Sequence, residues 1–340
     1  MRSNLLQADG KPAFGVFSGE IGDISLAEYQ IPGFWNLSGF LKKARTKRWR
    51  FVGFFSEDIV AGIAVVDAGY IGSTFSYAFD IKEGKLYEYR AQSPFGKAVS
   101  ISDHATSGSA IFTKGDNRIS MLYEADKSSR VDVDAQVEDG RLQIEAFLDE
   151  SFEAATPHQI TTPTPQGSFA FTHKTAGLPA HGKITVAGKT FILEEGKAFA
   201  AVDCTAGYHD YHWVWHWSSF GGLAKDGRRV GLNLVAPVHH PTITENAMWI
   251  ENKRVVLSEA RSEFDKKDVL KPWHISTIDG HVDLEFRPLG ERAESLNAGI
   301  FNSHFHQPIG TYHGTLKDED GSILELDGVR GVAEDHDAHW

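Results

Sequence analysis

Side chains capable of chemistry gather in the run at 208–220, YHDYHWVWHWSSF, which holds three histidines, three tryptophans, two tyrosines and an aspartate. In a β-strand, alternate side chains point to opposite faces. One face of such a strand carries Tyr211, Trp213, Trp215, Trp217 and Ser219. A row of indole rings could line a cavity for an apolar, ring-bearing or polyene ligand and stabilise a carbocation by cation–π attraction. The alternative is that these rings fill an ordinary hydrophobic core.

The opposite face of the same run is polar. It carries Asp210, His212, Val214, His216 and Ser218. Histidines that alternate with valine and serine suit a polar cavity or a wet interface between barrels, because a solvated surface would carry more lysine and glutamate. We therefore expect His212 and His216 to position water or to take up a proton.

A carboxyl group lies just ahead of this run, because Asp203 follows the apolar stretch AFAAV. Apolar and aromatic neighbours would raise its pKa by desolvation, which would keep the carboxyl protonated near neutrality and able to protonate an alkene. The other interpretation is a turn-forming or capping aspartate ahead of Thr205 and Gly207.

A second histidine cluster lies at 301–314, FNSHFHQPIGTYHG. On a strand, His304 and His306 share a face with their Cβ atoms about 6.6 Å apart, a spacing that can hold one metal ion. A turn at 308–310 would then bring His313 in from the neighbouring strand, and three imidazoles with an open fourth position make a hydrolytic or hydration zinc site. Without a metal, His306 could still act as an acid, a base or a hydrogen-bonding partner of the ligand.

The C-terminal EDH sequence places Glu334 two residues before His336. Glu334 could orient a histidine, but a solvated carboxylate or a pair with Arg330 is the simpler interpretation. The chain lacks GxxxxGK and GxGxxG fingerprints and a GxSxG elbow. We therefore expect no organic cofactor.

Charge and composition limit the class of partner. With 34 basic and 46 acidic residues, the net charge of −12 repels nucleic acid. The single cysteine, Cys204, and the lack of a signal peptide near Met1 favour a reducing cytoplasm. The longest apolar stretch, around 59–66, is far below the roughly 20 residues of a membrane span. A hydrophobic small molecule is the expected partner, and the oligomeric state is left open.

Strand and turn signals predict an all-β fold. Apolar and polar residues alternate at 130–137 and at 142–148, with Asp139 and Gly140 between them. Asp-Gly suits the positive φ angles of a tight hairpin turn. The same pair recurs between strand-like runs at 226–227, 279–280 and 320–321. The best helix candidate is short, at 37–45.

The Pro- and Thr-rich segment at 156–167 predicts a boundary between two domains, because proline cannot donate to a ladder. The runs at 48–67 and 212–235 support this division, since each has an aromatic strand, a polar turn and a second apolar strand. We expect two antiparallel β-barrels, at 1–160 and 161–340, with the candidate site in the second.

Several segments together resemble the bacterial family named domain of unknown function 2804. They are KRW at 47–49, AFAAVD at 198–203, WHWSS at 215–219, DGRRVGLNL at 226–234, PW at 272–273, HQPIG at 306–310 and GVAEDHDAHW at 331–340. That family is similar to the lipocalin-like, two-barrel proteins that include carotenoid hydratase, kievitone hydratase and, more distantly, tocopherol cyclase. The resemblance implies a calycin-type fold of two lipocalin-like barrels. It supplies no catalytic residues, and Cys204, His209 and His212 depart from the usual pattern.

The leading hypothesis is a protein that binds an apolar isoprenoid, steroid or long-chain molecule and catalyses its hydration, dehydration, isomerisation or cyclisation without an organic cofactor. Asp203 would donate the proton. The residues that would take up a proton or position water are His212, His216 and His306. The residues that would bind the ligand are Tyr211, Trp213, Trp215, Trp217 and, in the PW pair, Trp273.

Two other functions fit the same residues. The cavity could belong to a carrier that binds and releases a hydrophobic ligand without converting it. Alternatively, His304, His306 and His313 could form the metal site of a hydrolase.

Overall fold

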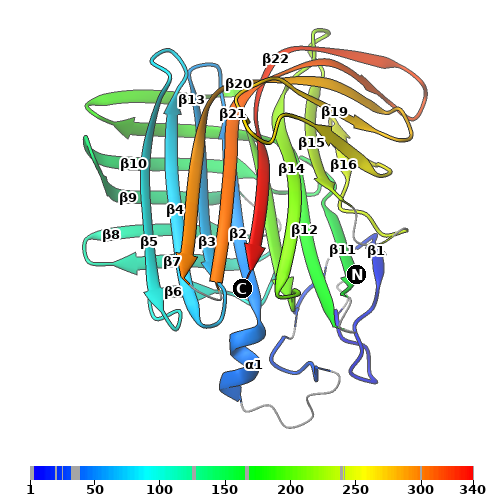
Figure 1. Ribbon diagram of the computed structural model, residues 1–340. Helices are drawn as coiled ribbons and strands as arrows, with labels where there is room; N and C mark the ends of the chain where they lie inside the picture. The colour runs from blue at the N-terminus through cyan, green and yellow to red at the C-terminus, as the bar shows by residue number, and fades with distance from the viewer. Residues whose placement is uncertain are drawn as a thin grey trace.

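Antiparallel β-strands make up almost all of the structure, a computed structural model that describes residues 4–19, 21–24, 26–31, 39–124, 128–164, 168–237, 240, 242–298 and 301–339 (Figure 1). The strands form two large curled sheets, a near-closed barrel and a half-barrel. The predicted all-β class with two lipocalin-like sheets and little helix is confirmed. Helical segments in the described ranges are too short and too polar to span a bilayer.

The first sheet has the strand order β5-β4-β3-β2-β13-β12-β10-β9-β8-β7-β6, and β11 pairs with β12 and β1. Its strands are β1 (Gly15–Phe17), β2 (Lys47–Phe55), β3 (Ile59–Asp67), β4 (Ile71–Asp80), β5 (Lys85–Pro94), β6 (Val99–Ile101), β7 (Gly108–Lys114), β8 (Asn117–Tyr123), β9 (Ser128–Val137), β10 (Gly140–Asp149), β11 (His158–Pro163), β12 (Phe169–Val186) and β13 (Lys189–Gly207). Helix α1 (Gly39–Arg45) precedes β2.

The second sheet has the order β17-β16-β15-β14-β22-β21-β20-β19-β18. Its strands are β14 (His212–Leu223), β15 (Arg229–Ala236), β16 (Ala247–Ile250), β17 (Lys253–Val256), β18 (Ala260–Glu263), β19 (Trp273–Thr277), β20 (Val282–Ala298), β21 (Phe301–Lys317) and β22 (Ile323–His339). In Figure 1, the long strands β20, β21 and β22, in orange and red, run alongside the blue and cyan strands of the first sheet. Strand β20 contacts β5 there.

The predicted hairpins are confirmed. Strands β9 and β10 pair across Asp139 and Gly140, and alternate residues of both strands are buried. The Asp-Gly pairs at 226–227, 279–280 and 320–321 each join two neighbouring strands, and the glycine of each pair has a positive φ. A positive φ costs glycine little, so these turns are set by local chemistry.

The helix expected at 37–45 is present from Gly39 to Arg45, and the chain passes from the first sheet to the second after Gly207. Helix α1 begins at Gly39, inside the expected range, while residues 37 and 38 lie outside the described residues. The first sheet continues through β12 and β13 as far as Gly207, and the second begins at His212. The domain division at 160 and 161 stays a prediction.

The two sheets pack against each other through one shared hydrophobic cluster. Phe51 and Ile63 of the first sheet belong to it, together with Trp217, Trp249 and Ile309 of the second. Burial of this apolar area from both sheets holds them together.

Glycines allow the two sheets to approach at backbone distance. A Cβ atom on Gly231 of β15 would lie 2.3 Å from the carbonyl carbon of Ala176 and 2.5 Å from the nitrogen of Gly177 in β12. A Cβ atom on Gly221 of β14 would lie 3.1 Å from the Cα of Gly177. The contact is backbone against backbone, so no side chain can move aside to admit a methyl group.

We predict that Gly231→Ala lowers the free energy of unfolding by roughly 3 kcal/mol, because the methyl group forces the two sheets apart. Gly227→Ala is the control, since a Cβ there meets nothing within 4 Å and only the positive φ adds a cost, about 1 kcal/mol. Urea titration measures both. An equal loss in the two variants would contradict the close contact between the sheets.

Candidate functional site

A pocket of about 160 Å³ lies between the two sheets. Strands β2, β3, β4, β12 and β13 supply residues to one wall, and β14, β15, β21 and β22 supply residues to the other. The aromatic side chains that line it are Trp49, Phe51, Phe75, Trp213, Trp215, Trp217 and Phe305. A volume of this order is enough for one aromatic ring.

The tryptophans of β14 lie where the strand alternation puts them, on one face. Trp213, Trp215 and Trp217 all line the pocket, and the Trp217 ring meets the Phe51 ring edge to face at 5.4 Å between centroids. Tyr211 shares that face but lies before the first residue of the strand, is 48% exposed and does not line the pocket. The pocket therefore uses three of the four expected aromatic residues of this run.

Trp273 lies away from the pocket. It is buried in the hydrophobic cluster of the second sheet, where its ring stacks on Phe264 at 3.8 Å between centroids. Its Nε1 donates to the carbonyl oxygen of Val269 at 2.8 Å. Phe264 in turn contacts His216, which lies on the face of β14 opposite the pocket, so Trp273 packs behind the sheet and does not reach the expected ligand.

Asp203 lines the pocket but is part of a buried ion cluster. It lies within β13, so it is neither a turn nor a capping residue, and its cross-strand partner on β12 is Lys174. The Lys174 Nζ is 2.5 Å from Asp203 Oδ2 and 3.2 Å from Glu245 Oε2. Burial alone would lower the pKa of Lys174, but the two carboxylates outweigh it and raise that pKa. Asp203 thus has a buried cationic partner, which the sequence did not lead us to expect.

Glu334 of β22 is a buried carboxyl group in the wall of the pocket. Trp215 Nε1 donates to its Oε1 at 2.6 Å, and Gln307 Nε2 donates to its Oε2 at 2.9 Å. Burial raises the pKa of Glu334 to about 7, despite these two hydrogen bonds and the charge of Arg292, which lower it. A carboxyl group with a pKa near the working pH is suited to general acid catalysis.

The Gln307 amide suits both protonation states of Glu334. Its Oε1 is buried and has no hydrogen-bond partner among the described residues. Rotation of the amide by half a turn would present this oxygen to a protonated Glu334.

The hydroxyl of Thr172, which also lines the pocket, is likewise buried without a partner in the described part of the chain. A ligand with a polar group can therefore bond to the pocket wall.

His336 is a neutral imidazole in the same wall. Burial lowers its pKa to about 3, and the charge of Arg292 acts in the same direction. Its Nε2 is 2.8 Å from the hydroxyl of Ser303, and its ring meets the edge of Trp215 at 4.2 Å between centroids. It can bond to a ligand or to water without becoming charged.

The three histidines expected to act in acid–base chemistry lie on the opposite face of the sheet. None of them lines the pocket. The ring nitrogens of His212, His216 and His306 lie 2.9, 2.9 and 3.0 Å from the carboxylates of Asp337, Asp335 and Glu291, respectively. The same alternation that brings Trp213 to Trp217 into the pocket points these histidines away from it.

The expected triad of His304, His306 and His313 does not assemble. His304 is hydrogen bonded to Ser295 at 3.2 Å, and His313 is 3.1 Å from Asp327. The turn expected at 308–310 is wrong, because β21 runs without a break from Phe301 to Lys317. Proline at 308 interrupts only the pairing with β22, which stops at His306 and resumes in the same register at Ile309.

Sequence reasoning missed part of the pocket. Lys174, Glu245 and Gln307 were not among the expected site residues, and Glu334 was assigned to the surface. The alternation on β22 puts Glu334 and His336 on one face, and Gln307 lies in the HQPIG segment. These two patterns could have indicated Glu334, His336 and Gln307 as site residues. Only the pairing of β14 with β22, however, shows that Glu334 and His336 lie beside the tryptophans.

Comparison with known proteins gives a family profile and a set of solved structures. The profile described as Domain of unknown function (DUF2804) matches residues 1–340. The structure of CghA with Sch210972 aligns with a TM-score of 0.55 and 11% identity, over 98% of this chain and 96% of that chain. Kievitone hydratase from Nectria haematococca aligns with a TM-score of 0.50 and 12% identity, over 96% and 98%. At this identity the likeness concerns the fold. No curated protein gives a significant match.

Proposed function

The chain belongs to the DUF2804 family, and we propose that it binds an apolar, ring-bearing small molecule between its two sheets and catalyses a reaction on it that begins with proton transfer. Hydration, dehydration, isomerisation and cyclisation are the reactions of this class. The observation that carries the proposal is the buried Glu334 carboxyl, which lies in the wall of a tryptophan-lined pocket and accepts a hydrogen bond from Trp215 there. Burial raises its pKa to about 7, within reach of general acid catalysis.

The pocket wall supports the choice of ligand. Trp213, Trp215 and Trp217 present indole rings on one side, and Phe51 and Phe75 lie on the other. Flat apolar surfaces of this kind favour a planar or polyene body. The volume suits a single ring, so an isoprenoid with a cyclic end group fits better than a straight acyl chain.

The Glu334 carboxyl can start the reaction. Transfer of its proton to one carbon of a C=C bond uses the π electrons and leaves a carbocation on the other carbon. Water can add to that carbon and return a proton to the carboxylate, which completes a hydration. Loss of a neighbouring proton to the carboxylate gives an isomer instead. Attack by a second double bond closes a ring and moves the positive charge to the far carbon of that bond, where loss of a proton to the carboxylate completes a cyclisation.

The surroundings of Glu334 can stabilise the carbocation. Indole faces attract a cation placed over them. The carboxylates of Asp203 and Glu245 also line the pocket, and because they share the one ammonium group of Lys174, an excess of negative charge remains there. In this proposal Asp203 stabilises the carbocation through its charge, and Glu334 donates the proton in its place.

The fold is compatible with such chemistry. One of the structures with the same fold is named a hydratase. A shared fold does not establish a shared reaction, so the weight of the proposal rests on the pocket residues.

Ligand binding is tested by quenching of tryptophan fluorescence with β-ionone, progesterone and palmitate, which represent an isoprenoid ring, a steroid and a long chain. We predict that β-ionone quenches most strongly, because its ring fits between the indoles. Val66→Phe, which fills the pocket, should weaken binding at least 10-fold. Val256→Phe is the matched control, because Val256 is 43% exposed on the outer surface. Equal binding in the two variants would contradict this site.

Catalysis is tested on the natural ligand. Native mass spectrometry of the purified protein identifies a bound molecule, and incubation with fresh molecule should give a product that differs by one water or is an isomer. Return of the molecule unchanged would identify a carrier and overturn the catalytic part of the proposal.

A further inference from the structure

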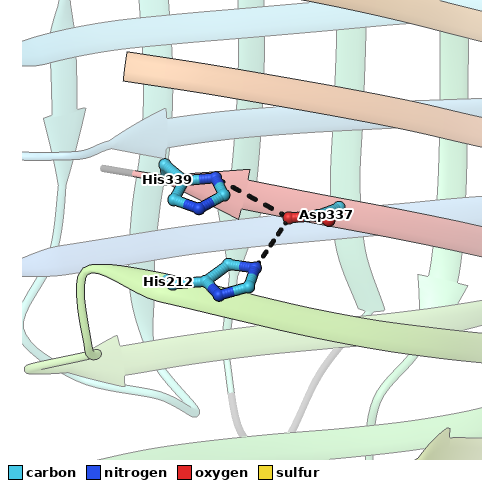
Figure 2. Close-up of side chains that lie close together, drawn as sticks. All are labelled: His212, Asp337 and His339. Atoms are coloured by element: carbon cyan, nitrogen blue, oxygen red, sulfur yellow. Dashed lines mark hydrogen bonds and ion pairs between the residues drawn. The ribbon is translucent and has the colours of Figure 1, made fainter. Parts of the chain in front are cut away.

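Two histidines and an aspartate converge on the face of the second sheet that points away from the pocket, where β14 begins and β22 ends. His212 is the first residue of β14 and is the cross-strand partner of His339, the last residue of β22. Asp337 lies two residues before His339 and therefore on the same face. Figure 2 shows both imidazole rings beside the Asp337 carboxylate. One potential ligand atom from each residue lies within 4.8 Å of the other two.

The distances between these atoms are within about 1.5 Å of those around a metal ion. Asp337 Oδ1 is 2.9 Å from His212 Nε2 and 3.7 Å from His339 Nδ1. Nitrogen and oxygen ligands about 2.0–2.2 Å from a tetrahedral ion lie about 3.4 Å from one another. Small side-chain rotations would therefore bring all three atoms to one ion.

We propose that His212, Asp337 and His339 bind a divalent transition-metal ion such as Zn²⁺. Two imidazole nitrogens and a carboxylate oxygen are ligands that Zn²⁺ accepts, whereas Mg²⁺ and Ca²⁺ require oxygen. Water fills the remaining positions, because the side chains of His212 and Asp337 are 51% and 49% exposed.

Two features distinguish this site from other exposed histidine–carboxylate pairs. The His212 and His339 rings are stacked with their centroids 4.0 Å apart, so both rings lie on the same side of the carboxylate. His274 also contacts carboxylates, those of Asp283 and Glu263, but it offers a single imidazole. No other group of three such ligands in the described residues comes this close together.

A bound ion would join two strands that form the pocket wall. Trp213 and Trp215 of β14 and Glu334 and His336 of β22 line the pocket from the other face of these strands. An ion that binds only the folded state stabilises it by mass action. The site would thus hold β14 against β22 whatever ligand the pocket takes, and it does not depend on the proposed function.

Isothermal titration of the full chain with ZnCl₂, after removal of any affinity tag and of metal by a chelator, tests the site. We expect one ion per chain and a rise in Tm when the ion is added. Asp337→Asn and His212→Ala should each weaken binding at least 10-fold and abolish the rise in Tm. His274→Ala is the matched control and should bind as the original protein does.

Circular dichroism of the metal-free variants checks that they fold, which we expect because the side chains replaced are exposed. Titration with MgCl₂ and CaCl₂ should give no heat. The proposal is overturned if the original chain binds no Zn²⁺, if His274→Ala loses as much affinity as Asp337→Asn, or if the Asp337→Asn and His212→Ala variants, shown to be folded, retain the affinity of the original chain.

Discussion

Glu334→Gln should reduce turnover of the natural ligand by at least about 100-fold, because glutamine cannot donate the proton that starts the reaction. Binding of the ligand should change little, since glutamine has the shape of glutamate. Trp215 can still donate to its oxygen, and Gln307 can rotate to accept from its amide. The rate of the original protein should fall as the pH rises through about 7, where Glu334 loses its proton. The remaining activity of Glu334→Gln should not fall as the pH rises through about 7, because glutamine does not titrate.

The same substitution has an effect on stability that needs no substrate. Glu334 has an ordinary pKa of 4.5 and a pKa of about 7 in the folded protein. Between these values the unfolded chain releases a proton that the folded chain keeps, so stability falls as the pH rises. Glutamine does not titrate. Relative to the original protein, Glu334→Gln should therefore gain on the order of 3 kcal/mol from pH 4.5 to pH 8.

Urea unfolding at a series of pH values measures this gain. Glu325→Gln is the matched control on the same strand, because the Glu325 side chain is 63% exposed and should give no such trend. A difference between Glu334→Gln and the original protein that stays constant with pH would show that Glu334 is ionised like a surface glutamate. That result would remove it as the proton donor.

Lys174→Met should lower the free energy of unfolding by about 3–5 kcal/mol, because it leaves the carboxylates of Asp203 and Glu245 without their buried cation. Lys225→Met removes a cation that also faces two carboxylates, but its side chain is 52% exposed. That control should lose no more than about 1 kcal/mol.

A second substitution separates the effect of the lost Lys174 charge from the effect of the altered packing at that position. Asp203→Asn added to Lys174→Met removes part of the unpaired negative charge, so the double variant should be more stable than Lys174→Met alone. Urea unfolding of the three variants gives the comparison. If Lys174→Met and Lys225→Met lose the same amount, the ion cluster is not a buried one.

The hairpins could be predicted because their causes are local. An Asp-Gly pair between alternating runs needs only its own backbone to form a tight turn, and all four such pairs do so. Alternation on β14 likewise determines that Trp213, Trp215 and Trp217 share a face. Where the cause lay outside the segment, the prediction was wrong. Pro308 was expected to turn the chain, but β21 continues through it and stays paired with β20 there.

The charge states of the candidate site could not be predicted from the sequence. Asp203 and Glu334 are both carboxyl groups that follow apolar residues. Tertiary structure gives Asp203 an ammonium partner, 29 residues away on β12. It gives Glu334 an indole and an amide, 119 and 27 residues away. A pKa depends on burial and on charges within a few ångströms, and both are settled only when distant strands pair.

The all-β class, the hairpins and the separation of indoles and imidazoles onto opposite faces of β14 could be predicted, since each follows from backbone geometry over a few residues. The face that encloses the pocket, the carboxyl group with the raised pKa and the histidines that meet an aspartate became known only from the folded chain. Those outcomes depend on the packing of the two sheets and on the register between β14 and β22, and contacts between residues so far apart in the chain leave no local pattern.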